Sequence, residues 1–249
     1  MNGHMIGAGR LGKNIARALT VSKLMALEFI CNRSLKSAQQ ACNAIDAGTA
    51  VDSILKLPPT DVTWIASNDD AIESIIKTLA QNTHIKPGSF VIHCSGVLNS
   101  RLLSPLKERG CFIASFHPLK AFIADVEDNA FKGVDCVLEG DDEVCNWLKL
   151  TFNQIGANII TIQPEAKALY HCAATLASNY LITLAACSEE LMRQAGIPAA
   201  HIRPMIGNLM QSNLNNLQRS EHMVDALTGP LMRGDLNTIQ THLKSLSNP

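Results

Sequence analysis

A glycine-rich loop near the start of the chain leads into a helical stretch and limits the folds available to it. The loop consists of Gly7, Ala8, Gly9, Arg10, Leu11 and Gly12 and fits the pattern G-x-G-x-x-G. In this pattern the first glycine permits a tight turn, the second lets a pyrophosphate approach the backbone, and the third lets the helix pack on a strand. The free N–H groups at the helix start are suited to binding phosphate. We therefore expect a strand, a turn and a helix that hold a dinucleotide.

The strand that should precede this loop has an unusual sequence. Such a strand is normally apolar, but residues 1–6 read MNGHMI. The segment Gly3-His4-Met5 is either a cloning remnant or a real irregularity of the strand. In both cases we expect the first strand to be short or frayed.

The first 163 residues alternate between short apolar runs and helical stretches, which is typical of a parallel sheet covered by helices. Strands are expected at residues 27–31, 61–67, 90–94 and 111–116, with edge strands at 134–139 and 159–162. Helices are expected at residues 12–22, 34–47, 71–81, 100–109 and 142–155, and Asp69 or Asp70 is expected to cap the third of them. The fold class is thus α/β, with a Rossmann-like domain over residues 1–163.

From residue 164 the pattern becomes entirely helical, which predicts a second domain over residues 164–249. Pro164 and Gly196 bracket one long helix, because proline suits a first helical turn and glycine a helix end. Further helices are expected at 199–217, where Pro204 marks a kink or a late start, near 223–227 and at 236–246. No charged residue occurs from Ala168 to Ser188, but polar residues interrupt this stretch. It therefore predicts a helix buried in a helical domain or in a dimer interface rather than a membrane span.

Composition excludes several classes of partner. The net charge is −1 and no block of like charges occurs, so nucleic acid is not expected to bind. The eight cysteines lack the C-x-x-C spacing of a zinc site, and the chain shows no secretory signal segment. Reduced cysteines in the core of a cytoplasmic protein, without a metal site, are the better interpretation.

The residues after the second expected strand indicate which dinucleotide is bound. NAD-binding proteins commonly have Asp or Glu about twenty residues past the glycine loop, where it holds the ribose 2′-hydroxyl. This chain has Asn32, Arg33 and Ser34 there. A guanidinium can bind a 2′-phosphate through two hydrogen bonds, and a serine at a helix start adds a hydroxyl and an N–H. We therefore predict NADP as the cofactor, the alternative being a surface arginine beside a helix cap.

Several further motifs together resemble a family of oxidoreductases that join a Rossmann-like domain to a C-terminal helical domain of unknown function. More distantly, the chain is similar to pyrroline-carboxylate reductases, prephenate dehydrogenases and beta-hydroxyacid dehydrogenases. The markers are Ile6–Gly12, His93–Gly96, Ser115–Leu119, Tyr170-His171, Ser178-Asn179-Tyr180 and Thr228–Asp235.

This resemblance implies that the nicotinamide lies over the carboxyl ends of the strands. The loop of Ser67, Asn68 and Asp69 would then touch the ribose and phosphates, and Ser95 with Gly96 would lie close to the nicotinamide. His117 would reach the same place from the sheet, its direction fixed by the following proline, unless its role is purely structural. The resemblance also implies a homodimer formed through the helical domain.

Five polar residues of the long helix form a stripe within an otherwise apolar surface. They are Lys167, His171, Thr175, Ser178 and Asn179. At about 100° per residue the first four fall within an arc of about 80°, so they share one helix face. Beta-hydroxyacid dehydrogenases carry a catalytic lysine with an asparagine one turn later; Lys167 matches the lysine, whereas His171 stands at the asparagine's position. The stripe is either part of a substrate cleft or a polar seam between helices or subunits.

These observations lead to a main functional hypothesis and an alternative. The main one is an NADP-dependent oxidoreductase that moves a hydride to or from a small carbonyl, imine or hydroxy compound. His171, Lys167 and His117 are the candidate proton donors; Asn179 is a further catalytic candidate, and Ser178 and Arg233 would contact the substrate. Arg233 could instead pair with Asp235 or another subunit, and Asp235 is most simply a helix cap. The alternative is a non-catalytic NADP-binding or sensor protein. A methyltransferase fits less well, because such enzymes usually have an acidic residue at the position of Asn32-Arg33.

Overall fold

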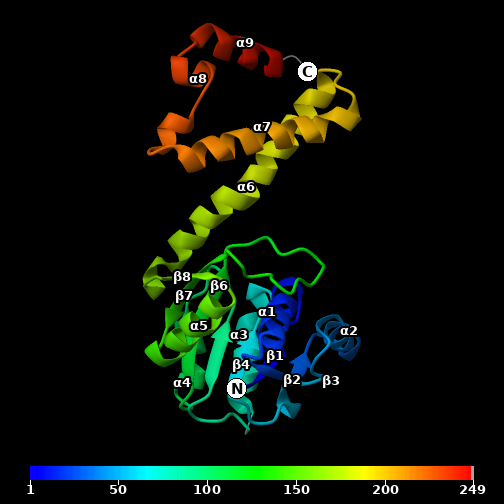
Figure 1. Ribbon diagram of the computed structural model, residues 1–249, viewed down its shortest axis with the longest axis vertical. Helices are drawn as coiled ribbons and strands as arrows, with labels where there is room; N and C mark the ends of the chain where they lie inside the picture. The colour runs from blue at the N-terminus through cyan, green and yellow to red at the C-terminus, as the bar shows by residue number, and fades with distance from the viewer. Residues whose placement is uncertain (83, 248–249) are drawn as a thin grey trace. The chain divides into compact units, whose positions relative to one another are not determined.

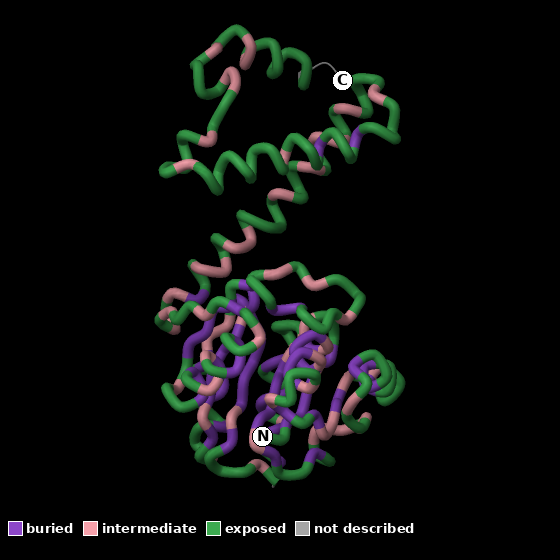
Figure 2. The backbone as a smooth tube through the Cα atoms, viewed as in Figure 1, coloured by how far each residue is buried: buried purple, intermediate pink, exposed green. Residues whose placement is uncertain are grey.

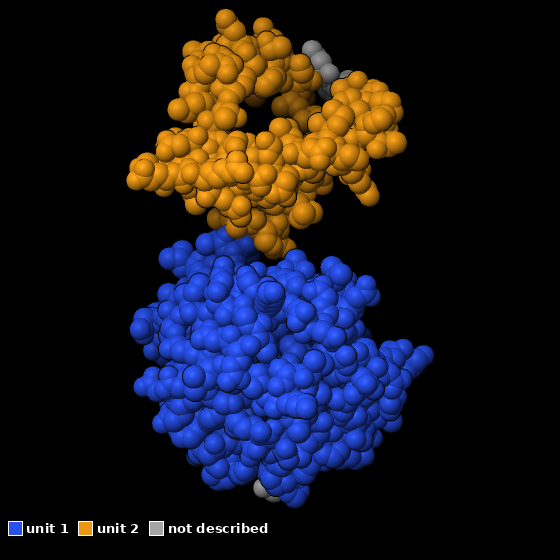
Figure 3. All heavy atoms as spheres, viewed as in Figure 1, with its two compact units in different colours: residues 1–175 blue, residues 176–249 orange. Residues whose placement is uncertain are grey.

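The computed structural model describes residues 1–82 and 84–247, and the chain divides into two compact units, Met1–Thr175 and Leu176–Pro249 (Figure 3). In the described part of the first unit, helices cover an eight-stranded sheet (Figure 1). The strands are β1 (Asn2–Ile6), β2 (Ala26–Cys31), β3 (Thr49–Val51), β4 (Val62–Ile65), β5 (Phe90–His93), β6 (Phe112–Pro118), β7 (Asp135–Gly140) and β8 (Asn158–Thr161). The helices are α1 (Arg10–Val21), α2 (Leu35–Ile45), η1 (Ile54–Lys56), α3 (Asp69–Gln81), η2 (Ser100–Leu103), α4 (Ser104–Lys107), α5 (Asp142–Gln154) and η3 (Pro164–Ala166).

The order of the strands confirms the expected fold class. The sheet runs β3-β2-β1-β4-β5-β6-β7-β8, and neighbouring strands are parallel except β6 and β7, which are antiparallel. The first unit is therefore a Rossmann-like α/β domain. Of the two strands expected at edges, β8 is one, but β7 lies inside the sheet between β6 and β8. The opposite edge strand, β3, was not predicted, because its three residues are too few to show an apolar pattern.

The core consists of two layers, one on each face of the sheet. Trp64 and Ile65 follow one another on β4, are both fully buried, and belong to different hydrophobic clusters. This is because successive side chains of a strand point to opposite faces. Helices α1, α2 and α5 cover the layer that holds Trp64, whereas α3 and α4 cover the layer that holds Ile65. A parallel sheet needs this cover on both faces.

The first strand is complete, so the expectation of a short or frayed strand was wrong. Four of its five residues are buried, and it pairs with both β2 and β4 with one register shift between Gly3 and His4. A Cβ on Gly3 would meet the side chain of Met25, so the glycine leaves room for this packing. His4 is accommodated because its Nε2 lies 3.0 Å from the carbonyl oxygen of Pro58 and its ring packs edge-on against Phe29.

The rest of the chain is helical, as expected. Its elements are α6 (Lys167–Gln194), α7 (Ala199–Arg219), η4 (Met223–Ala226), α8 (Pro230–Arg233) and α9 (Leu236–Ser247). Helix α7 contains Pro204 without starting late. The second unit has little core of its own: among its described residues only Ile202 and Ile206 are buried (Figure 2). Many large apolar side chains of this unit are exposed, including Ile182, Leu209 and Leu231.

The last strand ends at Thr161, just before the domain boundary predicted at residues 163–164. The two compact units divide later, between Thr175 and Leu176 within α6, so the boundary at 163–164 stays a prediction. Within residues 1–82 and 84–247, no helix is both long enough and apolar enough to cross a membrane.

Candidate functional site

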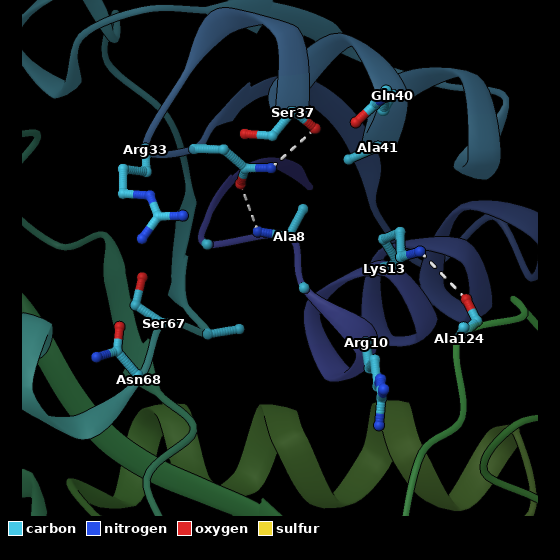
Figure 4. A pocket seen from close by; sticks show the side chains of 14 residues that line it. Ala8, Arg10, Lys13, Arg33, Ser37, Gln40, Ala41, Ser67, Asn68 and Ala124 are labelled. Atoms are coloured by element: carbon cyan, nitrogen blue, oxygen red, sulfur yellow. Dashed lines mark hydrogen bonds between the residues drawn. The ribbon is translucent and has the colours of Figure 1, made fainter.

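A groove of about 570 Å³ lies where β1, β2 and β4 end, and it contains most of the expected loop residues (Figure 4). Arg33, Ser67 and Asn68 lie on one side of it, and Arg10, Lys13 and Ala124 on the other. Its lining residues are Gly7, Ala8, Gly9, Arg10, Lys13, Asn32, Arg33, Ser37, Gln40, Ala41, Ala66, Ser67, Asn68 and Ala124. The sequence motifs therefore predicted much of the groove lining, but not the residues contributed by α2 and by the loop that holds Ala124.

Each glycine of the loop has a distinct reason to be glycine. Gly7 has a φ of +85°, and a Cβ there would lie 2.7 Å from the backbone nitrogen of Ser67. A Cβ on Gly12 would lie 2.7 Å from the carbonyl oxygen of Gly7. A Cβ on Gly9 would meet nothing within 4 Å, so this glycine borders open space in the groove. Two glycines thus hold the turn against the sheet, and the middle one leaves room for a ligand.

The electrostatics of the groove favour an anion. Helix α1 begins at its edge, with no side chain capping its N-terminus and no acidic residue in its first turn. The lining of the groove includes Arg10, Lys13 and Arg33 but no carboxylate. Among the described residues, none accepts a hydrogen bond from the guanidinium of Arg10 or Arg33, and none forms an ion pair with either group. Free N–H groups, the helix dipole and two available guanidinium groups together suit phosphate groups.

Asn32 and Ser34 both form hydrogen bonds that fix the local structure beside the groove. The side-chain oxygen of Asn32 accepts a hydrogen bond from the N–H of Ala8 at 2.7 Å, and its amide donates to the carbonyl oxygen of Ser37 at 3.0 Å. Asn32 therefore ties the glycine loop to the start of α2. Ser34 does not line the groove; its hydroxyl caps α2 by accepting from the N–H of Ser37. Ser37 lines the wall instead, one helical turn further along.

Five other residues expected to touch the cofactor do not line the groove, namely Leu11, Gly12, Asp69, Ser95 and Gly96. Leu11 packs against the hydrophobic core and Gly12 is buried under the turn. Asp69 lies in the first turn of α3, whose N-cap is Asn68 without a side-chain hydrogen bond, so the expected aspartate cap was wrong. The carboxylates in the first turn of α3 interact favourably with the positive end of the helix dipole rather than capping the helix.

The loop that carries Ala124 is held against α1 by three side chains of that helix. Lys13 donates to the carbonyl oxygen of Ala124 at 3.2 Å, and Asn14 accepts from the N–H of Glu127 at 3.0 Å. The Nε of Arg17 lies 2.7 Å from a carboxylate oxygen of Asp128. These contacts join residues more than 100 positions apart, and no pattern in the sequence indicates them.

A second group of polar side chains lies within the first unit where β5 and β6 end. Lys167 is only 1% exposed, and its ammonium donates to the hydroxyl oxygen of Ser115 at 2.5 Å. Burial lowers the pKa of Lys167 to about 8, while the negative charge of Glu139 acts in the opposite direction. The lysine is therefore largely protonated at neutral pH, although its proton is held more weakly than usual.

His117 and His171 lie together in this group, with ring centroids 5.5 Å apart. The Nδ1 of His117 is 2.8 Å from the hydroxyl of Tyr170, a residue that the family markers contained but the site prediction omitted. Burial lowers the pKa of His117 to about 4, and the charges of Lys167 and His171 add to this effect. His117 is therefore neutral near pH 7, chiefly because it is buried.

Gly96 is buried beside the two histidines. A Cβ on this residue would lie 2.6 Å from Cε1 of His171 and 3.0 Å from Nε2 of His117. The glycine thus makes room for the imidazoles. The Nδ1 of His171 is buried without a hydrogen-bond partner, which leaves it able to accept or donate to a ligand.

The remaining candidate residues belong to the second compact unit. Ser178 and Asn179 are exposed, and the hydroxyl of Ser178 donates to the side-chain oxygen of Asn179 at 3.3 Å. Arg233 pairs with the carboxylate of Asp235 at 2.7 Å, which is one of the two alternatives to a substrate contact. Of the polar stripe on α6, Lys167 and His171 therefore join the group at the ends of β5 and β6 within the first unit.

Comparison with known protein families assigns each half of the chain. Residues 1–118 match the Rossmann-like domain, and residues 134–249 match a domain of unknown function, DUF2520. The chain joins a Rossmann-like domain to a DUF2520 domain. The DUF2520 match begins near β7, so it includes the last two strands of the sheet as well as the C-terminal helices. A search of curated proteins found no significant match.

Solved structures that are similar to this chain include the following three. Protein TM1727 from Thermotoga maritima is 24% identical with a TM-score of 0.75, covering 98% of this chain and 89% of that one. A Bacteroides fragilis protein with the provisional name NADP oxidoreductase BF3122 is 20% identical with a TM-score of 0.80, covering 99% and 91%. The Plasmodium falciparum pyrroline carboxylate reductase with NADP bound is 13% identical with a TM-score of 0.64, covering 99% and 92%. At these identities the comparison establishes the fold.

The open space beside Gly9 generates a test of the groove. Gly9→Val should abolish NADPH binding in calorimetry while leaving thermal unfolding cooperative, because the added atoms would occupy the groove and a Cβ there meets no protein atom within 4 Å. Gly207→Val is the matched control, since a Cβ on this exposed helical glycine also meets nothing within 4 Å. Unchanged affinity in the Gly9 variant would mean that the dinucleotide lies elsewhere.

Proposed function

We propose that this protein is an NADP-dependent oxidoreductase that moves a hydride between NADP(H) and a small carbonyl, imine or hydroxy compound. The observation that carries the proposal is the groove of Gly7, Gly9 and Arg33, on the same edge of the sheet as the buried Lys167. The bound NADP of the similar Plasmodium reductase supports a nicotinamide dinucleotide as the cofactor.

The residues of the groove fit NADP. The space beside Gly9 and the start of α1 would take the pyrophosphate, because no side chain fills this space and no side chain caps the first N–H groups of the helix. The unpaired guanidinium of Arg33 would bind the 2′-phosphate, with the hydroxyl of Ser37 on the same wall. The lack of a carboxylate in the lining removes both the usual partner of a free 2′-hydroxyl and the charge that would repel a phosphate.

When bound, the cofactor supplies or accepts the hydride. The protein must then provide a proton donor for the oxygen or nitrogen that becomes negative. Lys167 is the best of the three candidates, because a pKa of about 8 leaves it protonated and still able to release its proton. His117, with a pKa of about 4, is neutral and is better suited to orient Tyr170 or the substrate. His171, whose Nδ1 is unpartnered, would contact the substrate.

The requirement for a 2′-phosphate can be tested at Arg33. Arg33→Ala should weaken NADPH binding by about 10- to 100-fold, the usual value of a hydrogen-bonded charge, and leave NADH binding nearly unchanged. Lys36→Ala is a suitable control, because Lys36 is exposed nearby but does not line the groove. Affinities are measured by calorimetry, and equal losses for both nucleotides would refute the assignment.

The role of Lys167 can be tested once a metabolite screen, read by NADPH oxidation, identifies a substrate. Lys167→Met should lower turnover by about 100-fold or more without changing NADPH affinity, because it removes a general acid. In the wild type, reduction should be fastest below pH 8 and decline as the pH rises through about 8, where the lysine loses its proton. Lys77→Met, on an exposed helix face, is the control. If NADPH binds but nothing in the screen is turned over, the alternative of a non-catalytic sensor is favoured.

We also propose that the protein acts as a homodimer in the cytoplasm. The exposed apolar side chains of α6 and α7 and the small core of the second unit support a subunit interface there. Six buried cysteines with free thiols support a reducing compartment.

Sedimentation at micromolar concentration should therefore show a dimer. Ile182→Glu, at a side chain that is 68% exposed on α6, should shift the protein toward monomer, because it would bury a charge in the interface. Val21→Glu, at an exposed position of the first unit, should leave the dimer intact. A monomeric wild-type protein would contradict the proposed dimer and would mean that α6 packs only within its own chain.

A further inference from the structure

Glu139 is a buried carboxylate to which the sequence motifs gave no role. It lies on β7 and is 1% exposed. In the antiparallel pairing of β6 and β7 it stands directly opposite Ser115, the residue that accepts the hydrogen bond from Lys167. Among the described residues, Glu139 is the only buried carboxylate and Lys167 the only buried Lys or Arg side chain.

Both side-chain oxygens of Glu139 accept hydrogen bonds from Ser100. One oxygen accepts from the N–H of Ser100 at 2.7 Å, and the other accepts from the hydroxyl of Ser100 at 2.6 Å. Within the described part of the chain, no Lys or Arg nitrogen lies within 4.0 Å of it as a salt-bridge partner. A buried charge without a partner of opposite sign is costly. The buried cation available to balance this charge is the ammonium of Lys167, which bonds to Ser115 directly opposite Glu139 and whose charged form Glu139 favours.

We propose that Glu139 is a positioning residue that keeps Lys167 charged on Ser115 and fixes the loop after β5 through Ser100. This inference rests on the proposed function only in giving Lys167 a chemical task. The same contacts place the loop that contains Ser95 and Gly96, because Ser100 ends this loop and begins η2. The charge state of Lys167 and the position of the loop after β5 would then both depend on the side chain of Glu139.

The other groups near Lys167 do not provide this balance. Asp69 also favours the charged lysine, but it is exposed to water. Burial raises the pKa of Cys94 to about 12, so its thiol is neutral. Burial also lowers the pKa values of His93 and His117 to about 4, so neither carries a charge near neutral pH. Any charge on the nearby His171 would repel the ammonium rather than stabilise it.

The test follows the ammonium directly, without cofactor or substrate. In protein labelled with ¹³C-lysine, the Cε signal of Lys167, assigned with Lys167→Met, reports the pKa of this residue. Glu139→Gln should lower that pKa by about one pH unit or more, as expected for removing a nearby opposite charge. Glu143→Gln, an exposed carboxylate on α5, should leave it unchanged. An unchanged Lys167 pKa in the folded Glu139→Gln variant would overturn the proposal, because loss of packing alone does not remove a charge.

A second measurement applies if the Glu139 variant does not fold. In the wild type, the side-chain carboxyl carbon of Glu139 should show the shift of an ionised group at pH 7 and a deflection where Lys167 titrates. A protonated Glu139 at pH 7, or no response to Lys167, would overturn the proposal. Both experiments are independent of NADPH, so a failure of the proposed function leaves their outcome interpretable.

Discussion

The close approach of the glycine loop to β4 is the constraint on which the groove depends. Gly7 can adopt its positive φ and lie against Ser67 only because it lacks a Cβ, and Gly12 packs directly on the carbonyl of Gly7. This contact aims the uncapped start of α1 at the space beside Gly9. Asn32 then fixes the loop to α2, which brings Arg33 to the same groove. A side chain at either outer glycine would move the helix, and the anion site would be lost with it.

The groove beside the glycine loop and the polar group at the ends of β5 and β6 have different electrostatic environments. The groove beside the glycine loop is open, and the guanidinium groups that line it are exposed to water and available to an anion. The group at the ends of β5 and β6 is buried, so its one ammonium requires a buried carboxylate, and burial keeps His93 and His117 neutral near pH 7. The parallel sheet allows both environments, because its carboxyl ends lie at one edge while adjacent strands differ in how deeply they are covered.

The sequence was sufficient for features that depend on local pattern. Apolar periodicity predicted the sheet and its helices, and the glycine spacing predicted the groove. It failed for features decided by distant partners. The strand at His4 is complete because Pro58 and Phe29 accommodate the imidazole. Ser37 rather than Ser34 lines the groove because the nearer hydroxyl caps α2. The sequence did not indicate a role for Glu139, because that role depends on the strand register that places it opposite Ser115. An isolated glutamate in an apolar strand was the one available signal.

Hydrogen–deuterium exchange with and without NADPH tests the central claim most directly, because it reads the backbone amides that the loop would present to the phosphates. We predict slower exchange on binding in residues 8–13, at the start of α1, and in residues 33–37, at the start of α2. Residues 142–146, at the start of α5 and outside the groove, should exchange at the same rate in both states. Binding of NADPH without protection of residues 8–13, or no binding at all, would contradict the account.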